Sequence, residues 1–287
     1  LGLAAAVLAL RMEKEKPSAA RGEPFDLSGS LLYAAALFAL MYGFSRLTSS
    51  LGAVLVAGGG VCFIVFIRRQ LKNRSPLINL HLFLGNRVFV FSNLAALIHY
   101  CATFAITFLL SIYLQHVKGL SPSQTGLLLV IEPLLQAFFS PLAGRLSDHY
   151  EPRIISSIGM SLTVVGLAGL IFIAADTPIW AILFCLALLG TGFALFSSPN
   201  VNAVMSAVNS KYYGIASATQ ATMRMVGQML SMGITMLVFA WIIGNRGINH
   251  ENGLLLIKSA KILFAILAVL CVSGVFASLA RGRVHKA

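Results

Sequence analysis

The chain has 287 residues, of which 58% are hydrophobic and 10% are charged, with 21 Lys and Arg against 9 Asp and Glu. Soluble globular proteins carry about 25% charged residues, so this composition excludes a soluble globule and indicates an integral membrane protein. The net charge of +12 does not indicate a nucleic-acid surface, because the basic residues are distributed between apolar stretches rather than gathered on one segment.

The first residues are expected to belong to a structure that begins upstream. Residues 1–11 are mostly apolar but fall well short of the ~20 residues that cross a bilayer. Positive charges follow this run, whereas a signal peptide carries them before it. We therefore expect residues 1–11 to be the end of a truncated helix, so that the chain is a C-terminal fragment. Residues 12–26 are charged, contain Pro17 and Pro24, and are predicted to be a cytoplasmic linker.

Apolar stretches of membrane-spanning length follow one another along the rest of the chain. They are continuous rather than alternating, which excludes an outer-membrane barrel and predicts an all-α, polytopic helical bundle. The predicted spans are residues 27–46, 51–67, 88–114, 123–143, 153–175, 178–197, 213–243 and 258–280.

The spacing of these spans divides the chain. Residues 27–67 form a helix pair, because the turn near residues 48–50 is too short for anything but an antiparallel hairpin. Residues 68–87 are a second basic, cytoplasmic linker. Residues 88–281 hold six spans, and residues 282–287 form a cytoplasmic tail.

The basic residues orient the bundle. If residues 144–153 are cytoplasmic, roughly three quarters of the Lys and Arg residues fall on the cytoplasmic side, including Arg68, Arg69 and Arg281. This excess fits the positive-inside rule and predicts a multi-pass protein of the cell membrane with both ends of the fragment in the cytoplasm.

A charged turn between two apolar spans carries the most specific motif. Residues 144–153 read Gly-Arg-Leu-Ser-Asp-His-Tyr-Glu-Pro-Arg, and this resembles the cytoplasmic loop signature of the major facilitator superfamily. The matching positions are Gly144, Leu146, Asp148 and Arg153. The departures are His149, Glu151 and Pro152, where the family usually has Arg, Gly and a further basic residue.

Two roles are open for this signature loop. Arg145 and Arg153 are placed to pair with Asp148 and Glu151 across the cytoplasmic mouth, and such pairs could break and reform as two halves rock. Alternatively, the acids only cap the helix that begins near Pro152, and the basic residues only fix the topology.

The order of a helix pair followed by six helices resembles the fourteen-span drug:proton antiporter branch of that superfamily. Pro199, Asn200 and Asn202 resemble that branch's Pro-Asn segment at an inner helix end, and Gly214 to Ser217 followed by Arg224 resembles its Gly-x-Ala-Ser segment with a helix-embedded arginine. The resemblance implies a proton-coupled multidrug exporter that works by alternating access. Its implied partners are a missing N-terminal six-helix half of the same chain, the lipid bilayer, a small hydrophobic or amphipathic substrate, and protons.

Glu132 is the strongest candidate for a proton-coupling group. It is the carboxylate that lies well inside a predicted span, about 16 Å along the helix from Ser121, near the bilayer midplane. An unpaired carboxylate is costly to ionise there, so it could exchange a proton as its access to water changes. Gln136, one turn later, shares its face and could bond to it or to a substrate. The alternative is a structural acid that is protonated or paired with an arginine.

Two further polar residues lie inside spans. Arg224 is expected to face the bundle interior or a water-filled cavity, where it could pair with Glu132, bind an anionic group or snorkel toward the inner surface. His99 is a substrate candidate too, although an isolated histidine among apolar residues is more often a packed, hydrogen-bonded residue.

The sequence offers no pattern for an enzyme, a cofactor or a metal. It contains no His-Glu-x-x-His, no Gly-x-Ser-x-Gly and no Walker lysine after a glycine loop, and the four cysteines have no metal-binding spacing. We therefore expect a transporter driven by an ion gradient. Two alternatives stay open: a facilitator of another substrate, such as a lipid, peptide or organic acid, and a membrane sensor, interaction protein or intramembrane enzyme in which Glu132 and Arg224 form a structural ion pair.

Overall fold

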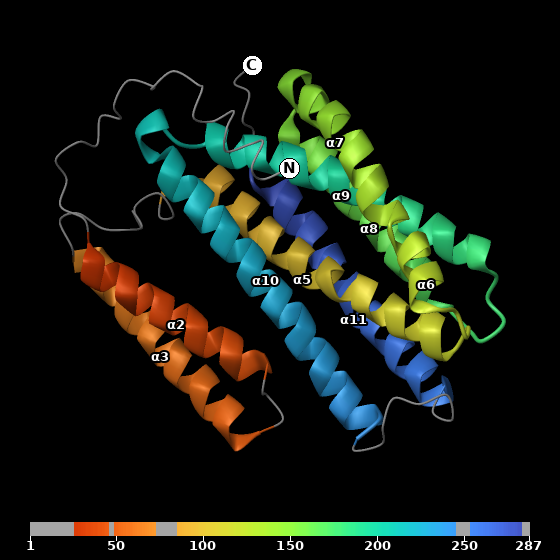
Figure 1. Ribbon diagram of the computed structural model, residues 1–287. Coiled ribbons are helices and arrows are strands. Elements are labelled where there is room, and N and C mark those ends of the chain that lie inside the picture. The colour runs from red at the N-terminus through yellow and green to blue at the C-terminus, as the bar shows by residue number, and fades with distance from the viewer. Residues whose placement is uncertain (1–25, 46–48, 73–84, 245–252, 283–287) are drawn as a thin grey trace, which may run out of the picture.

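The computed structural model describes residues 26–45, 49–72, 85–244 and 253–282. The predictions for residues 1–25 and for most of the second linker and the tail lie outside the described residues. In chain order the helices are α2 (Leu27–Ser45), α3 (Ser50–Lys72), α5 (Arg87–His116), α6 (Pro122–Leu129), α7 (Ile131–His149), α8 (Pro152–Ile171), α9 (Ile179–Ser206), the short 3-10 helix η1 (Ser210–Tyr212), α10 (Tyr213–Ile242) and α11 (Gly253–Ala280) (Figure 1).

The all-α, polytopic prediction is confirmed for the part of the chain that the structure describes. Eight segments are long and apolar enough to span a membrane, with α6 and α7 together forming one of them. Each overlaps a span predicted from hydropathy. Several helices are longer than predicted: α3 continues to Lys72, so Arg69 and Lys72 lie in its last turn, where they interact favourably with the helix dipole.

Helices α2 and α3 form an antiparallel pair beside the other helices. Asp26 caps α2 by accepting a hydrogen bond from the backbone N–H of Gly29 (2.8 Å). The same carboxylate accepts a hydrogen bond from Gln70 Nε2 (2.9 Å) and lies 3.8 Å from the Arg69 guanidinium, so the start of α2 is tied to the end of α3. The pair packs against the rest of the bundle mainly through α2 and α10.

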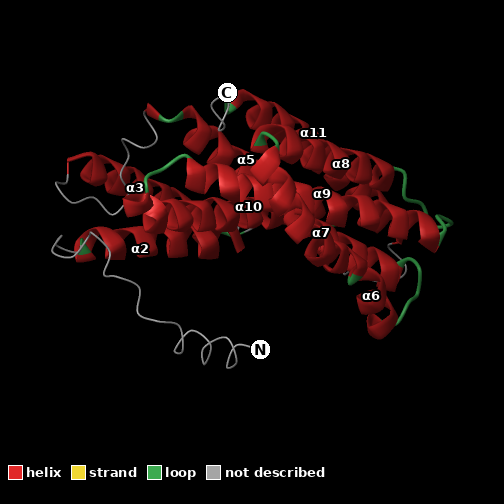
Figure 2. Cartoon of the chain, turned by 90° about the horizontal axis from the view of Figure 1, so that it is seen from above, coloured by secondary structure: helices red, strands yellow, loops and turns green. Residues whose placement is uncertain are grey.

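The remaining helices form a compact body. α10 packs on α5, α5 on α11, α11 on α8, and α8 on α9. Figure 2 shows α2 and α3 on one flank of this body and α6 on the opposite flank. The main core joins α5, α8, α9 and α11. The span over Arg87–His116 is the most buried of the eight: 56% of the apolar stretch that was compared in each span is buried. This centre is apolar, as expected where side chains pack against each other and not against lipid.

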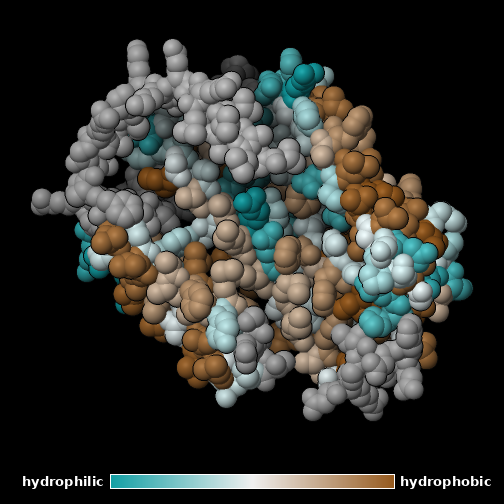
Figure 3. Space-filling model, viewed as in Figure 1, coloured by the Kyte–Doolittle hydropathy of each residue, from teal (hydrophilic) through white to brown (hydrophobic). Residues whose placement is uncertain are grey.

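Glycines allow close helix approach in this body. A Cβ atom at Gly159 of α8 would lie 2.6 Å from the backbone oxygen of Gly192 on α9, and one at Gly192 would lie 2.7 Å from the oxygen of Gly159. Small residues let backbones approach in this way in membrane bundles, where water does not drive helices together. The outer surface is apolar over wide areas (Figure 3). Large apolar side chains such as Phe138 and Phe276 are exposed on the bundle.

Candidate functional site

The span that holds Glu132 is broken near its middle. α6 ends at Leu129 and α7 begins at Ile131, with Val130 between them. Pro133 explains the break, because it has no N–H to donate to the carbonyl of Leu129. Glu132 therefore lies in the first turn of α7, inside the membrane-spanning segment Pro122–His149.

Glu132 faces a cavity of about 670 Å³ between α5, α6, α7, α9 and α10. The lining residues are Tyr100, Thr103, Phe104, Thr107, Phe108, Ser111, Leu129, Glu132, Phe193, Gln228 and Met232. The Thr107 side chain is a hydrogen-bond partner of the Glu132 carboxyl group. The cavity thus combines one carboxyl group, hydroxyl and amide groups, and aromatic walls.

Gly190 holds α9 against the broken span. A Cβ atom at this position would lie 2.4 Å from the backbone oxygen of Glu132, closer than real Cβ contacts allow. Because the nearest atoms belong to the backbone, no side-chain rotation relieves the clash. The glycine therefore sets the distance between α9 and the helix break that carries Glu132.

Gly190→Ala is expected to lower the melting temperature of the purified protein in detergent by about 3–8 °C, because overpacking a tight site costs about 1–3 kcal/mol. Gly214→Ala is the matched control: this helical glycine has no atoms within 4 Å of an added Cβ, so the change should be neutral or slightly stabilising. Equal melting temperatures for the two variants would contradict the close approach at Gly190.

The other residues singled out within the spans do not join Glu132 at this cavity. Gln136 shares α7 with Glu132 but does not line the cavity. Arg224 is exposed on α10, and within the described residues it forms no ion pair with Glu132. It lies one turn before Gln228, whose side chain does reach the cavity.

His99 lies behind the cavity wall. It is fully buried, and its ring centroid lies 4.0 Å from that of Phe196 and 5.0 Å from that of Phe193. Neither ring nitrogen has a hydrogen-bond partner among the described residues. Tyr100 and Phe193, which contact it, line the cavity, so His99 supports the wall without lining the cavity itself.

Three hydroxyl residues were missed from the sequence. Thr103, Thr107 and Ser111 recur at every fourth position of α5, and all three line the cavity. Residues four apart share a helix face, so this spacing of hydroxyl residues in an otherwise apolar span predicts a polar stripe on one face of the helix. Gln228 gave no such pattern, because it is a single amide within α10.

The signature residues lie on a helix end and not in an open loop, which corrects the prediction. α7 continues through Gly144 to His149, and only Tyr150 and Glu151 separate it from α8. The helical hydrogen bonds continue to the end of this segment, where the backbone N–H of Tyr150 donates to the oxygen of Leu146 (2.9 Å). A Cβ atom at Gly144 would lie 3.0 Å from Ser198 Oγ, so α7 packs closely against α9 here. Asp148 is therefore in the last turn of α7 and does not cap α8 as expected.

The partners of the signature also differ from those expected. Asn202 Nδ2 of α9 donates a hydrogen bond to Ser147 Oγ (2.5 Å) and lies 3.5 Å from Asp148 Oδ1. Among the described residues Asp148 and Arg145 form no ion pair. Glu151 occupies the N-cap position of α8, with Pro152 as the first helical residue, but its side chain makes no capping hydrogen bond.

The Pro-Asn segment is not a helix end. α9 continues to Ser206, so Pro199 lies inside the helix and the prediction of a helix end was wrong. The reason lies in tertiary packing: Pro199 and Asn200 are both buried against neighbouring helices.

Asn200 belongs to a buried polar cluster at the same end of the bundle. Arg281, just past α11, is completely buried. Its guanidinium donates to Asn200 Oδ1 (3.0 Å) and Ser92 Oγ (3.3 Å). It also donates to the backbone oxygen of Pro152 (3.0 Å) and to Ser278 Oγ (3.0 Å). One side chain thus joins α5, α8, α9 and α11.

Arg281 stays charged in this site. Burial lowers its pKa to about 10, and the carboxylate of Glu151 opposes that effect. Since neutral pH lies well below 10, the guanidinium keeps its proton and its full set of donors. The positive-inside prediction treated Arg281 only as a marker of the cytoplasmic side.

Comparison with known proteins agrees with this architecture. The family model described as Major Facilitator Superfamily matches residues 3–232 and 92–286. The uncharacterized transporter YebQ of Escherichia coli is 31% identical over 99% of this chain and 61% of its own length. The riboflavin transporter RibZ of Clostridioides difficile is 28% identical over 78% of this chain and 49% of its own length. The multidrug resistance protein Stp of Mycobacterium tuberculosis is 28% identical over 75% of this chain and 40% of its own length.

The chain spans about half the length of the curated relatives it matches. Among solved structures, a bacterial homolog of the human lysosomal transporter Spinster superposes with a TM-score of 0.54 at 14% identity, covering 88% of this chain and 68% of that chain. That likeness supports the helical fold. With a family match over most of its length, the chain belongs to the Major Facilitator Superfamily of membrane transporters.

Proposed function

We propose that the chain is the C-terminal portion of a fourteen-span exporter that couples the outward movement of hydrophobic or amphipathic compounds to proton entry. One observation carries the proposal: a single carboxyl group, Glu132, lies at a helix break inside the membrane and faces a cavity with aromatic, hydroxyl and amide walls. Some relatives are named for resistance to multiple drugs or to methyl viologen, which is consistent with export of such compounds.

In this proposal Glu132 is the group that gains and loses a proton. A carboxyl group surrounded by apolar and aromatic side chains is costly to ionise, so proton release is favoured when water or a cationic substrate reaches it. The Thr107 hydroxyl can donate to the carboxylate and accept from the protonated acid, so it serves both states. Aromatic walls from Tyr100, Phe108 and Phe193 contact the substrate.

The exposed faces of the bundle support the assignment of a half transporter. In the Pro122–His149 span only 6% of the apolar stretch is buried inside the bundle. In the Ser210–Ile242 span the buried share is 28%. Both spans contribute to the Glu132 cavity. We propose that a six-helix half encoded upstream covers these faces, so that the cavity lies between two halves and opens alternately to each side.

The orientation follows from the same proposal. The last turn of α7 and the Arg281 cluster lie at one end of the bundle, linked through Asn200 and Asn202 of α9. We assign this end to the cytoplasm, because the basic residues gather there.

Proton coupling is tested with the complete protein in proteoliposomes that contain a pH-sensitive dye. An imposed substrate gradient is expected to move protons in the opposite direction, and collapsing the pH gradient with an uncoupler should lower uphill substrate movement by about tenfold or more. Residues 1–287 reconstituted alone should give no specific flux. Substrate flux that ignores the pH gradient would exclude proton coupling, and equal flux from residues 1–287 would exclude the half-transporter assignment.

A further inference from the structure

A second hollow lies between the helix pair and the six-helix body. It has a volume of about 460 Å³ and is lined by Met41, Phe44, Phe104, Met225, Gln228, Met229, Met232, Gly233 and Met236. Five of the nine methionines of the chain therefore face one hollow. We refer to it as the methionine groove.

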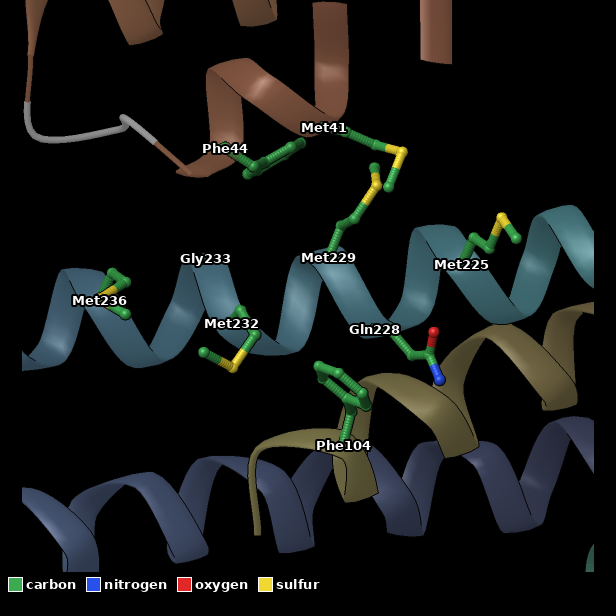
Figure 4. Close-up of a pocket in the computed structure, with 9 residues that line it drawn as sticks. All are labelled: Met41, Phe44, Phe104, Met225, Gln228, Met229, Met232, Gly233 and Met236. Carbon is green, nitrogen blue, oxygen red and sulfur yellow. The ribbon is translucent and has the colours of Figure 1, made fainter. Parts of the chain in front are cut away.

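The methionines form one stripe on α10. Met225, Met229, Met232 and Met236 are spaced by four, three and four residues, which places them on the same helix face. Figure 4 shows Met229 pointing toward Met41 of α2, with Phe44 beside them. α2 thus supplies the opposite wall of the groove.

The lining defines what the groove can accept. Among the described residues that line it, none is charged and Gln228 is the only polar one. Thioether side chains are flexible and make favourable contacts with aromatic rings, so a methionine wall can adapt to ring systems of different outline. The rings of Phe44 and Phe104 offer further stacking surfaces. A flat aromatic solute with no localised charge fits this chemistry.

The methionine groove adjoins the Glu132 cavity. Phe104, Gln228 and Met232 line both hollows. The groove borders α2, of whose apolar window only 17% is buried within the bundle, which leaves most of this apolar helix available to lipid. A solute dissolved in the bilayer could therefore reach Glu132 between α2 and α10 without crossing the aqueous phase.

We propose that the methionine groove is the lateral path by which flat aromatic solutes pass from the bilayer to the Glu132 cavity. This inference rests on the proposed export function and adds to it a substrate class and a route. Gln228 marks the point where the solute leaves the thioether wall and meets the polar groups of the cavity.

Occupancy is tested first, without any need for transport. In the complete protein with its native cysteines replaced by alanine, the Met229→Cys variant is labelled with N-ethylmaleimide in vesicles, with and without the uncharged, membrane-dissolved aromatic dye Nile red. The dye should slow labelling about fivefold or more, because both compete for one site. Met223→Cys is the matched control, since this residue lies on the same helix but does not line the groove. Its labelling rate should not change.

Passage is tested by filling the groove. Met229→Trp should lower the initial rate of dye extraction from the bilayer about tenfold, whereas Met229→Leu, which conserves volume, should stay within about twofold of the wild type. Met223→Trp controls for a bulky residue elsewhere on α10. Labelling of the Met229→Cys variant that the dye does not slow, together with wild-type extraction by Met229→Trp, would overturn the inference.

Two other results are informative. If the thiol introduced by Met229→Cys is shielded in vesicles without dye and the dye changes nothing, a lipid chain fills the groove and the proposed path is excluded. If the dye protects that thiol but the rate of dye extraction does not depend on the pH gradient, the groove is confirmed as a binding site and the proton-coupled function is excluded. The two proposals can therefore fail separately.

Discussion

Glu132→Gln in the complete protein is expected to reduce export driven by a pH gradient to about one hundredth of the wild-type rate or less. The amide keeps the size of the side chain and can still interact with Thr107, but it cannot bind and release a proton. Exchange of substrate down its own gradient should persist, because the cavity keeps its volume and its aromatic walls. Proteoliposome flux at several external pH values measures both activities.

Asp176→Asn is the matched control for that change. Asp176 is exposed in the connection between α8 and α9, so the same loss of a carboxylate occurs outside the membrane-spanning segments. It should leave flux and its pH dependence unaltered. If Glu132→Gln also exports with the wild-type pH dependence, the proton carrier lies elsewhere and Glu132 is a structural partner of Thr107.

Arg281→Met is expected to lower the melting temperature by about 10 °C, because removing one partner of a buried polar cluster costs about 3–5 kcal/mol. The guanidinium donates to groups on four helices, and methionine would leave Asn200 Oδ1 and the Pro152 carbonyl without those donors. Arg281→Lys keeps the charge but not the planar fork, so it should fall between the wild type and Arg281→Met.

Arg145→Met serves as the control for the arginine cluster. Arg145 is exposed near the end of α7, so its loss should shift the melting temperature by no more than about 2 °C. Thermal unfolding followed by size-exclusion chromatography in detergent compares the variants. If Arg281→Met and Arg145→Met have the same melting temperature, the hydrogen bonds of Arg281 do not stabilise the bundle.

The spans could be predicted from the sequence because the constraint behind them is strong. Lipid requires each backbone group to be hydrogen-bonded within its own segment, so a long apolar run such as residues 88–114 has to be helical. The same counting predicts a position near mid-membrane for Glu132. Pro133 next to it was sufficient to indicate a break in that helix.

The partners of Glu132 and Arg281 could not be predicted, because they depend on contacts between helices that hydropathy does not encode. The Glu132 cavity joins α7 to α5 and α10, and nothing in the order of residues pairs Glu132 with Thr107 or Gln228. Arg281 shows the same limit. A basic residue after an apolar run marks a membrane surface, and only the packing of four helices around it makes it a buried donor. Similarly, Pro199 alone predicts a helix end, whereas in the structure it is buried inside α9.

The break at Val130 has a mechanical consequence. Ser121 and Gln124 form a capping box that fixes the start of α6, while the other end of the span is attached to α9 through Ser147 and Asn202. Between these two fixed ends, the absent hydrogen bond at Pro133 makes bending easier than in an unbroken helix. Glu132 is next to the pivot, so a change in the angle between α6 and α7 would alter the direction of its carboxyl group with little displacement of its backbone, while both ends of the span stay in place.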